Sequence, residues 1–125
     1  MIGIDLISVP RMERLLKKFG KKALLRFLCE KEIELVKNGT TASGFWAAKE
    51  AFSKALGTGI GADCSFHDIK IYKDKQGAPK IALSRRIIQK FDITQVALSI
   101  THDGEFAIAV VTLETSTSAD KVKEF

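Results

Sequence analysis

The hydrophobic residues at the start of this chain form a run typical of a strand, and those directly after it recur at the spacing of a helix. Residues 2–8, IGIDLIS, form an Ile-rich apolar run that is typical of a buried strand. Pro10 suits the first turn of a helix, and four apolar positions at helical spacing predict that this helix runs to a break at Gly20. We therefore expect a strand that leads at once into an amphipathic helix.

The next third of the chain is predicted to be helical. Residues 21–39 are interpreted as one or two helices that end at Asn38 and Gly39, where glycine accepts a left-handed cap conformation. A further helix is expected over about 45–56, with Thr40, Thr41 or Ser43 as its cap. Small residues recur every four positions along it, which would let another element approach closely. They are Ala47, Ala51 and Ala55.

The remaining segments are interpreted mainly as strands. Residues 65–74 alternate between apolar and polar, 75–79 contain a turn, and 80–84 form a short strand. Residues 96–114 are the clearest hairpin, with a turn at Asp103 and Gly104. We predict an α+β fold, with a small antiparallel sheet packed against helices, in one domain of residues 1–114. The Ser/Thr/Lys-rich tail, residues 115–125, is predicted to be loose.

Composition adds limits to this layout. The 125 residues are 46% hydrophobic, enough for one compact core without disulfides or metal staples. Cys29 and Cys64 have no companion Cys/His spacing, so we interpret both as thiols in a reducing cytoplasm. We see no secretory signal pattern and no apolar run near the roughly 18 residues of a membrane span. A cytoplasmic protein without a membrane partner is expected.

The net charge of the chain is a moderate +5, but its basic residues are concentrated near the N-terminus. One stretch of basic residues near the N-terminus contains a single acid, Glu13, and should attract an anionic partner. Its basic members are Arg11, Arg14, Lys17, Lys18, Lys21, Lys22 and Arg26.

Candidate chemistry lies in the predicted strand and the predicted helix. Trp46, Glu50 and Lys54 share one helical face; the plain alternative is a surface ion pair contributing about 0.3 to 0.5 kcal/mol. Asp5 lies inside an apolar strand, where a carboxylate is costly unless it is hydrogen-bonded, ion-paired or bound to a cation.

A glycine-rich turn follows the helix. Gly57, Gly59 and Gly61 either end the helix or offer backbone N–H groups to a phosphate. Two carboxylates, a lysine and such a turn together suit a Mg2+-diphosphate site, because the metal takes hard oxygen ligands and the cations and N–H groups neutralise phosphate charge.

Four segments carry a family resemblance. GIDL (3–6), WAAKEAFSKALGTGIG (46–61), GAP (77–79) and LSITHDGEFAIAVV (98–111) resemble the holo-acyl-carrier-protein synthases, the short bacterial branch of the 4'-phosphopantetheinyl transferases. The resemblance runs in order over nearly the whole chain and ends at Glu114.

The resemblance implies an enzyme that moves the 4'-phosphopantetheine arm of coenzyme A onto a serine of apo acyl carrier protein. Adenosine 3',5'-bisphosphate is released, Mg2+ is required, and the reaction supports fatty acid biosynthesis. By matching positions, Asp5 and Glu50 would hold the metal, and Glu50, Lys54 and His102 would be catalytic. The residues implied to bind coenzyme A are Lys54, Gly57, Gly59, Gly77, Pro79 and His102.

Several assignments stay open at this point. The serine proton could pass to a metal-bound water, to Glu50, or to His102 beside Asp103. Without the resemblance, His102 is equally a surface or capping residue before a turn. His67 matches no functional position and is interpreted as a polar strand residue.

The chain departs from the family at one place. Related enzymes commonly have Gly-Arg-Phe where this chain has Gly44, Phe45 and Trp46, and that arginine helps to hold the phosphates of coenzyme A. Phe45 cannot do so. Lys49 and Arg86 are the substitutes we consider, and weaker coenzyme A binding is the alternative.

The resemblance also implies partners. Acyl carrier proteins are acidic, so Arg11, Arg14 and Arg26, with Met12 as an apolar contact, are expected to bind the carrier. A homotrimer is implied, with sites at subunit interfaces and His102 acting in trans to Asp5 and Glu50.

Two other functions share features of this sequence. A nucleic-acid-binding module would also be basic, but aromatic residues are not interleaved with the basic ones and the acids would repel phosphodiester, so no nucleic acid partner is expected. A transferase for a specialised carrier, rather than the fatty-acid one, would have the same chemistry.

Overall fold

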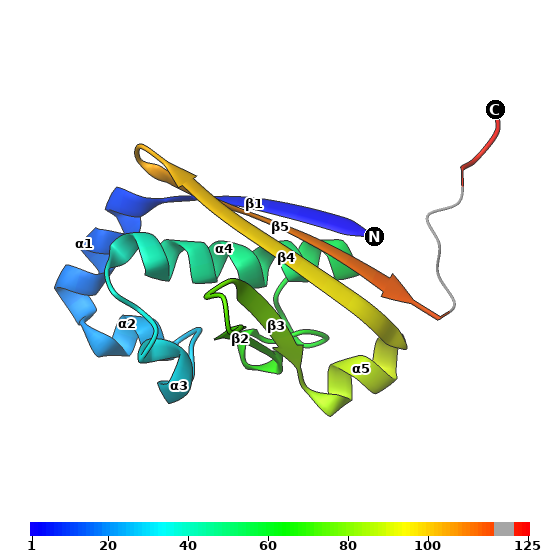
Figure 1. Cartoon of the computed structure of the whole chain (residues 1–125), viewed down its shortest axis with the longest axis horizontal. Coiled ribbons are helices and arrows are strands. Elements are labelled where there is room, and N and C mark those ends of the chain that lie inside the picture. Colours follow the sequence, from blue (N-terminus) through cyan, green and yellow to red (C-terminus); the bar gives the residue numbers. More distant parts are fainter. Residues whose placement is uncertain (117–121) are drawn as a thin grey trace.

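The computed structural model describes residues 1–116 and 122–125. Within these residues, one strand followed by helices makes up the first half of the chain, and strands dominate the second (Figure 1). The elements in chain order are β1 (Ile2–Ser8), α1 (Val9–Phe19), α2 (Lys21–Leu25), α3 (Glu30–Ile33), α4 (Gly39–Leu56), the short 3-10 helix η1 (Phe66–Asp68), β2 (Ile69–Lys73), β3 (Pro79–Leu83), α5 (Arg85–Phe91), β4 (Ile93–Asp103) and β5 (Phe106–Thr115).

The strands form two antiparallel sheets. The larger has the order β1-β5-β4, and the smaller is the β2-β3 hairpin. Figure 1 shows the long helix α4 running along one face of the three-stranded sheet, with α1, α2 and α3 gathered at one end and α5 at the other. The predicted α+β class is confirmed, and the predicted hairpin is the β4-β5 pair, whose turn contains Gly104 at φ 56.

Close contact between β1 and α4 depends on small residues. A Cβ atom on Gly3 would lie 2.0 Å from the carbonyl oxygen of Ala51, so only glycine permits this spacing. Ala47, Ala51 and Ala55 are buried against the sheet, which confirms the predicted small-residue stripe. Because Asp5 is two residues after Gly3 on the same strand face, its carboxylate is brought close to α4.

Helix α4 begins six residues earlier than predicted. Asn38 is its N-cap, and the Asn38 side chain accepts a hydrogen bond of 3.0 Å from the backbone N–H of Thr41. The predicted cap residues at 40, 41 and 43 therefore lie inside the helix, and the predicted left-handed cap at Gly39 is wrong. The extra turns matter because they form one wall of a pocket described below.

Other boundaries also differ from the predictions. The short helix α5 was not anticipated; its N-cap is Ser84, whose hydroxyl accepts the N–H of Ile87. His67 lies in η1 rather than in a strand. β5 extends to Thr115, one residue beyond the predicted domain end. The prediction of a loose tail falls partly on residues 117–121, which lie outside the described residues, while 122–125 contain no helix or strand.

Candidate active site

An acid-lysine cluster forms where β1 crosses α4. The ammonium group of Lys54 lies 3.0 Å from Asp5 Oδ1 and donates a second hydrogen bond of 3.1 Å to the backbone carbonyl of Ile4. The Lys54 side chain is 52% exposed, whereas that of Asp5 is only 13% exposed. One side of the cluster is therefore open to a ligand and the other is enclosed by the fold.

The cluster holds more negative charge than its lysine satisfies. Asp5 Oδ2 is buried and has no hydrogen-bond partner among the described residues. Burial raises the pKa of Glu50, the neighbouring charge of Asp5 raises it further, and Lys54 opposes both effects. Glu50 and Asp5 therefore lie close enough to repel each other, and a shared cation would relieve this repulsion.

The donor set suits a hard cation with an incomplete protein shell. In the described part of the chain no three His, Cys, Asp or Glu side chains gather as potential metal ligands. Two carboxylates are what remains, and Mg2+ is commonly held by one or two carboxylates while waters and substrate phosphates complete its octahedron. The orphaned Asp5 oxygen and the two acids therefore fit a Mg2+ ion.

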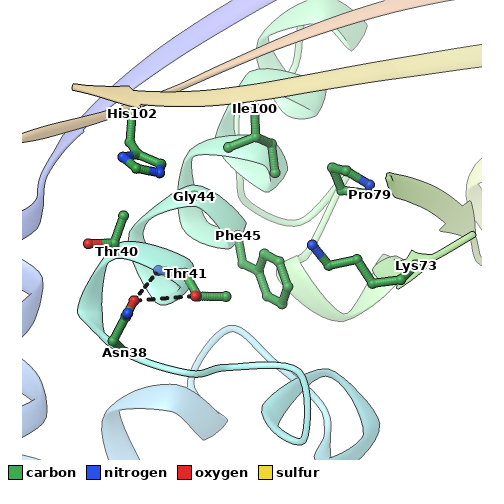
Figure 2. Close-up of a pocket in the computed structure, with 9 residues that line it drawn as sticks. All are labelled: Asn38, Thr40, Thr41, Gly44, Phe45, Lys73, Pro79, Ile100 and His102. Atoms are coloured by element: carbon green, nitrogen blue, oxygen red, sulfur yellow. Dashed lines mark hydrogen bonds between the residues drawn. The ribbon is translucent and has the colours of Figure 1, made fainter. Parts of the chain in front are cut away.

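A separate pocket of about 360 Å³ lies between the first turns of α4, strand β4 and the β2-β3 hairpin (Figure 2). We call it the His102 pocket. It is lined by Asn38, Thr40, Thr41, Gly44, Phe45, Lys73, Pro79, Ile100 and His102. A neighbouring pocket of about 400 Å³ shares Thr41 and Lys73 with it and includes Gly77. Three residues that the resemblance implied for coenzyme A, Gly77, Pro79 and His102, are thus gathered here.

The two sites lie on different faces of α4. At 3.6 residues per turn, Glu50 and Lys54 are rotated by about 140° and 180° from Phe45, which lines the His102 pocket. Strand β5 also separates β1, which carries Asp5, from β4, which carries His102. One chain therefore brings Asp5, Glu50 and Lys54 together, and brings Pro79 and His102 together, but does not join the two groups.

The first N–H groups of the glycine-rich turn after α4 already have an acceptor inside the protein. The N–H groups of Gly57, Thr58 and Gly59 all donate to the carbonyl oxygen of Ser53, at 3.0 to 3.1 Å. Gly57 is the left-handed C-cap of α4, with φ 90. The N–H groups of Gly57 and Gly59 therefore already have an acceptor in this structure and the turn ends the helix, while the implied contact of these glycines with coenzyme A stays a prediction.

Neither substitute proposed for the family arginine is available. The ammonium group of Lys49 is buried and donates to Phe27 O at 2.7 Å, Glu32 Oε1 at 2.9 Å and Phe66 O at 3.1 Å. Burial lowers the pKa of Lys49, and the charge and hydrogen bond of Glu32 oppose this shift. Lys49 therefore belongs to the core.

Arg86 is also occupied, because it is paired with Asp68. Cys29 and Cys64 are free thiols, as predicted, and burial raises the pKa of Cys64 to about 11. A thiol with that pKa is protonated near neutral pH and is a poor nucleophile.

The basic N-terminal surface differs from the prediction in one residue. Arg11, Arg14 and Arg26 are exposed, as a docking role requires. Met12 is only 4% exposed and packs in the core, so it has almost no surface to offer a partner. The exposed apolar residues of this region are Phe19 and Leu25. The sequence places Met12 among the apolar positions of α1. It does not show that the rest of the protein covers this face of the helix.

Some lining residues of the His102 pocket were not recognised from sequence. Thr40 and Thr41 were noted only as caps, and their run of hydrogen-bonding side chains was the available signal for a polar pocket wall. Lys73 gave no signal, since it is one of several lysines in a strand and turn segment.

The chain is similar to known proteins over most of its length. A model of the 4'-phosphopantetheinyl transferase superfamily matches residues 1–111. The holo-[acyl-carrier-protein] synthase of Sulfurimonas denitrificans is 64% identical over 122 residues, which cover 98% of this chain and 100% of that relative. The enzyme of the same name from Nautilia profundicola is 58% identical over 113 residues, covering 90% of this chain and 98% of that relative.

Solved structures are similar as well. The crystal structure of Helicobacter pylori holo-[acyl-carrier-protein] synthase in complex with coenzyme A has a TM-score of 0.88 and 48% identity, covering 91% of this chain and 100% of that one. The holo-[acyl-carrier-protein] synthase of Neisseria meningitidis has a TM-score of 0.82 and 33% identity, covering 91% of this chain and 97% of that one. In the described residues, no helix is long and apolar enough to span a membrane.

Proposed function

The chain belongs to the 4'-phosphopantetheinyl transferase superfamily, and on this basis we propose which of its residues perform the transfer. The enzyme moves the 4'-phosphopantetheine arm of coenzyme A onto a serine of apo acyl carrier protein, which supports fatty acid biosynthesis. The serine oxygen attacks the phosphorus that carries the arm, the bond from that phosphorus to the bridging oxygen breaks, and adenosine 3',5'-bisphosphate leaves as the serine loses its proton.

Asp5 and Glu50 are proposed to hold Mg2+, and the observation that supports this most directly is the buried, unpartnered Asp5 Oδ2 beside Glu50. When bound, Mg2+ supplies positive charge to diphosphate oxygens that become more negative as the bond to the leaving group breaks. Lys54 is the cation at the open side of the same cluster, and we assign it to the diphosphate.

A second copy of the chain is proposed to complete the site. The outer face of the large sheet carries Ile2, Ile4 and Leu6, all more than half exposed. Ile108 and Val110 lie on the same face, because they pair with Leu6 and Ile4 in the sheet. An apolar face of this kind is typical of a protein interface. Since the acid cluster and the His102 pocket lie on different faces of α4, packing of neighbouring copies in a homotrimer would let one copy's acids meet the next copy's His102.

The basic surface formed by Arg11, Arg14 and Arg26, with exposed Phe19 and Leu25, is proposed to bind the acidic carrier protein. Exposed charges of this kind steer an oppositely charged partner and fix its orientation. The cytoplasmic location stays a prediction.

Mixing inactive variants tests the shared site. Glu50→Ala and His102→Ala should each be inactive alone, because each removes one half of every site. After subunit exchange at equal amounts, about a quarter of the interfaces in a cyclic trimer would combine an intact acid pair with an intact histidine, and activity should recover accordingly.

The control is a mixture of Glu50→Ala and Lys54→Ala, which affect the same half of the site and should not complement each other. Native mass spectrometry must show mixed trimers in both experiments. Mixed trimers of the first pair without recovered transfer would mean that His102 acts within its own chain or takes no part.

A further inference from the structure

A hydrogen-bonded network joins the two strands of the β2-β3 hairpin at its base. Asp68, the last residue of η1, accepts hydrogen bonds at Oδ2 from the backbone N–H and the hydroxyl of Ser65, at 2.9 and 3.2 Å. Its Oδ1 accepts from the hydroxyl of Ser84 at 2.7 Å and from Nε of Arg86 at 3.3 Å, and Nη2 of Arg86 also donates to Oδ2. The backbone N–H of Ser84 donates to the backbone carbonyl of Asp68 at 2.9 Å. We call these four residues the Asp68 network.

The network lies at the opposite end of the hairpin from the His102 pocket. The strand register runs from Ile69 opposite Leu83 at the base to Lys73 opposite Pro79 at the tip. Lys73 and Pro79 line the pocket on the side away from Asn38 (Figure 2). Within the described residues, β2 and β3 pair with no third strand. Because a two-stranded hairpin alone is only marginally stable, contacts from outside must fix its orientation.

Contacts near the middle of the hairpin do not reach its tip. Ile71 and Ile81 pair with each other and are buried in the core, and the N–H of Ile71 donates to Glu32 Oε2 at 2.9 Å. The tip extends beyond this pair. Since β2 has five residues, it rises by about 13 Å along its length, and a tilt of about 5° at the base would move the tip by about 1 Å.

The Asp68 carboxylate is suited to holding segments together rather than to binding a ligand. Its side chain is only 10% exposed, and both of its oxygens already accept hydrogen bonds. The donors belong to different segments, because Ser65 precedes η1, Ser84 is the N-cap of α5, and Arg86 lies within α5. A buried polar network whose groups are all hydrogen-bonded makes its surroundings rigid and favours one arrangement of them.

We propose that Asp68 is a positioning residue for coenzyme A: the Asp68 network sets the tilt of the β2-β3 hairpin, and this tilt places the pocket wall formed by Lys73 and Pro79. The inference rests on the proposed function, in which the His102 pocket is one half of a site shared between copies. Asp68 acts only through the hairpin and touches neither substrate nor the reacting atoms.

Loss of the network should affect substrate affinity more than the chemical step. A displacement of about 1 Å in a positioning contact can cost up to about 100-fold in the efficiency of an enzyme. The hairpin carries none of the groups proposed to act on the diphosphate or on the serine proton, since these lie on β1, α4 and β4. A misplaced wall should therefore raise KM for coenzyme A and leave kcat nearly unchanged.

The test compares Asp68→Asn with Asp63→Asn in steady-state transfer, at a temperature below the unfolding transition of every variant. Asparagine has the shape of aspartate, but its amide nitrogen cannot accept a hydrogen bond. Asp63 is the matched control, because it is an exposed carboxylate that pairs with Lys90 of α5 at 2.7 Å, and its replacement removes the same charge beside the same helix. We expect Asp68→Asn to raise KM for coenzyme A by about 10-fold, with kcat and KM for the apo carrier changed by less than about twofold. Asp63→Asn should change none of these values.

Ser84 offers a second and milder pair of variants. Ser84→Ala removes the hydroxyl that donates to Asp68, whereas Ser84→Thr keeps a hydroxyl for Asp68 and for the N–H of Ile87. We expect Ser84→Ala to raise KM for coenzyme A and Ser84→Thr to preserve the wild-type value. Adding Ser84→Ala to Asp68→Asn should change KM little further, because both substitutions act through one network.

Hydrogen exchange gives a readout that does not depend on transfer. Amide protons of residues 69–83 should exchange faster in Asp68→Asn than in wild type, while those of residues 39–56 in α4 should keep their protection. Added coenzyme A should restore protection to the hairpin.

Unchanged exchange in the hairpin, or an unchanged KM for coenzyme A in Asp68→Asn, would overturn the proposal, since core packing alone would then fix the pocket wall. An equal KM increase in Asp63→Asn would overturn it by assigning the effect to charge. A fall in kcat at unchanged KM would also overturn it. Absence of any transfer by the wild type would instead refute the proposed function.

Discussion

Replacing Lys49 and Lys54 separately with methionine should separate folding from catalysis, although the two lysines are five residues apart on α4. The Lys49 side chain is fully buried, and its ion-pair partner Glu32 is 2% exposed. Lys49→Met leaves that carboxylate without a counter-charge and leaves the carbonyl groups of Phe27 and Phe66 without this donor. Among the described residues, Glu32 then keeps its hydrogen bonds from the N–H groups of Cys29 and Ile71 and no others.

The magnitude follows from the burial. Breaking a buried pair by removing one partner costs about 3 to 5 kcal/mol, out of a total stability of about 5 to 15 kcal/mol for a domain. For a chain of this size, that corresponds to a fall in Tm of roughly 10 to 20 °C. Lys54→Met removes a half-exposed ion pair worth at most about 1 kcal/mol, so its Tm should fall by less than about 4 °C while transfer is lost.

Trp46 provides the assay for unfolding. It is the single tryptophan of the chain, and its ring centroid lies 4.9 Å from that of Phe27 and 4.8 Å from that of Phe66, the two residues whose carbonyls accept from Lys49. Urea and thermal unfolding followed by Trp46 fluorescence, at one fixed protein concentration, should report the loss directly. The double variant Lys49→Met/Glu32→Gln should be less destabilised than Lys49→Met alone, because the unpaired buried charge is gone.

Two outcomes would refute this reasoning. A Lys49→Met protein with an unchanged Tm and lost transfer would identify Lys49 as a substrate contact. Equal destabilisation by the two variants would mean that burial does not distinguish the two ion pairs.

Two further predictions concern β1 and η1. Gly3→Ala places a Cβ atom against the Ala51 carbonyl, so β1 and Asp5 should move away from α4, and both Tm and transfer should fall. The control is Gly61→Ala, because a Cβ atom at Gly61 meets open space and Gly61 has no positive φ. A Gly3→Ala protein with normal Tm and transfer would contradict the close approach of β1 and α4. Burial alone would raise the pKa of Asp68, but hydrogen bonds from Arg86, Ser65 and Ser84 lower it well below its usual range. Asp68 should therefore stabilise the fold above about pH 4 and lose this effect as the pH falls toward 2. The Tm difference between wild type and Asp68→Asn should shrink over that range. A constant Tm difference would contradict the lowered pKa of Asp68.

Local sequence pattern predicted those parts of the site whose geometry is set over a few residues. The four-residue spacing of Glu50 and Lys54 placed them on one helix face, and the alanine stripe predicted a close neighbour for that helix. Asp5 in an apolar strand predicted a carboxylate in need of compensation, and the structure shows one of its oxygens still without a partner. The β4-β5 hairpin was equally local, since a turn at Gly104 joins two β-prone runs.

Long-range packing decided the rest. Lys49 and Glu50 are neighbours in sequence, but Lys49 is buried because Glu32, which is 17 residues away along the chain, reaches it, while Glu50 faces Asp5. Met12 is buried in the core, although the spacing of apolar residues in α1 does not distinguish it from the other apolar positions of that helix.

The His102 pocket is the clearest case, because α4, β4 and the β2-β3 hairpin meet there and no one segment contains its pattern. Periodicity along the chain determined which residues share a face of a helix or strand. Only the tertiary structure decided which face is covered, because that depends on contacts between segments far apart in sequence.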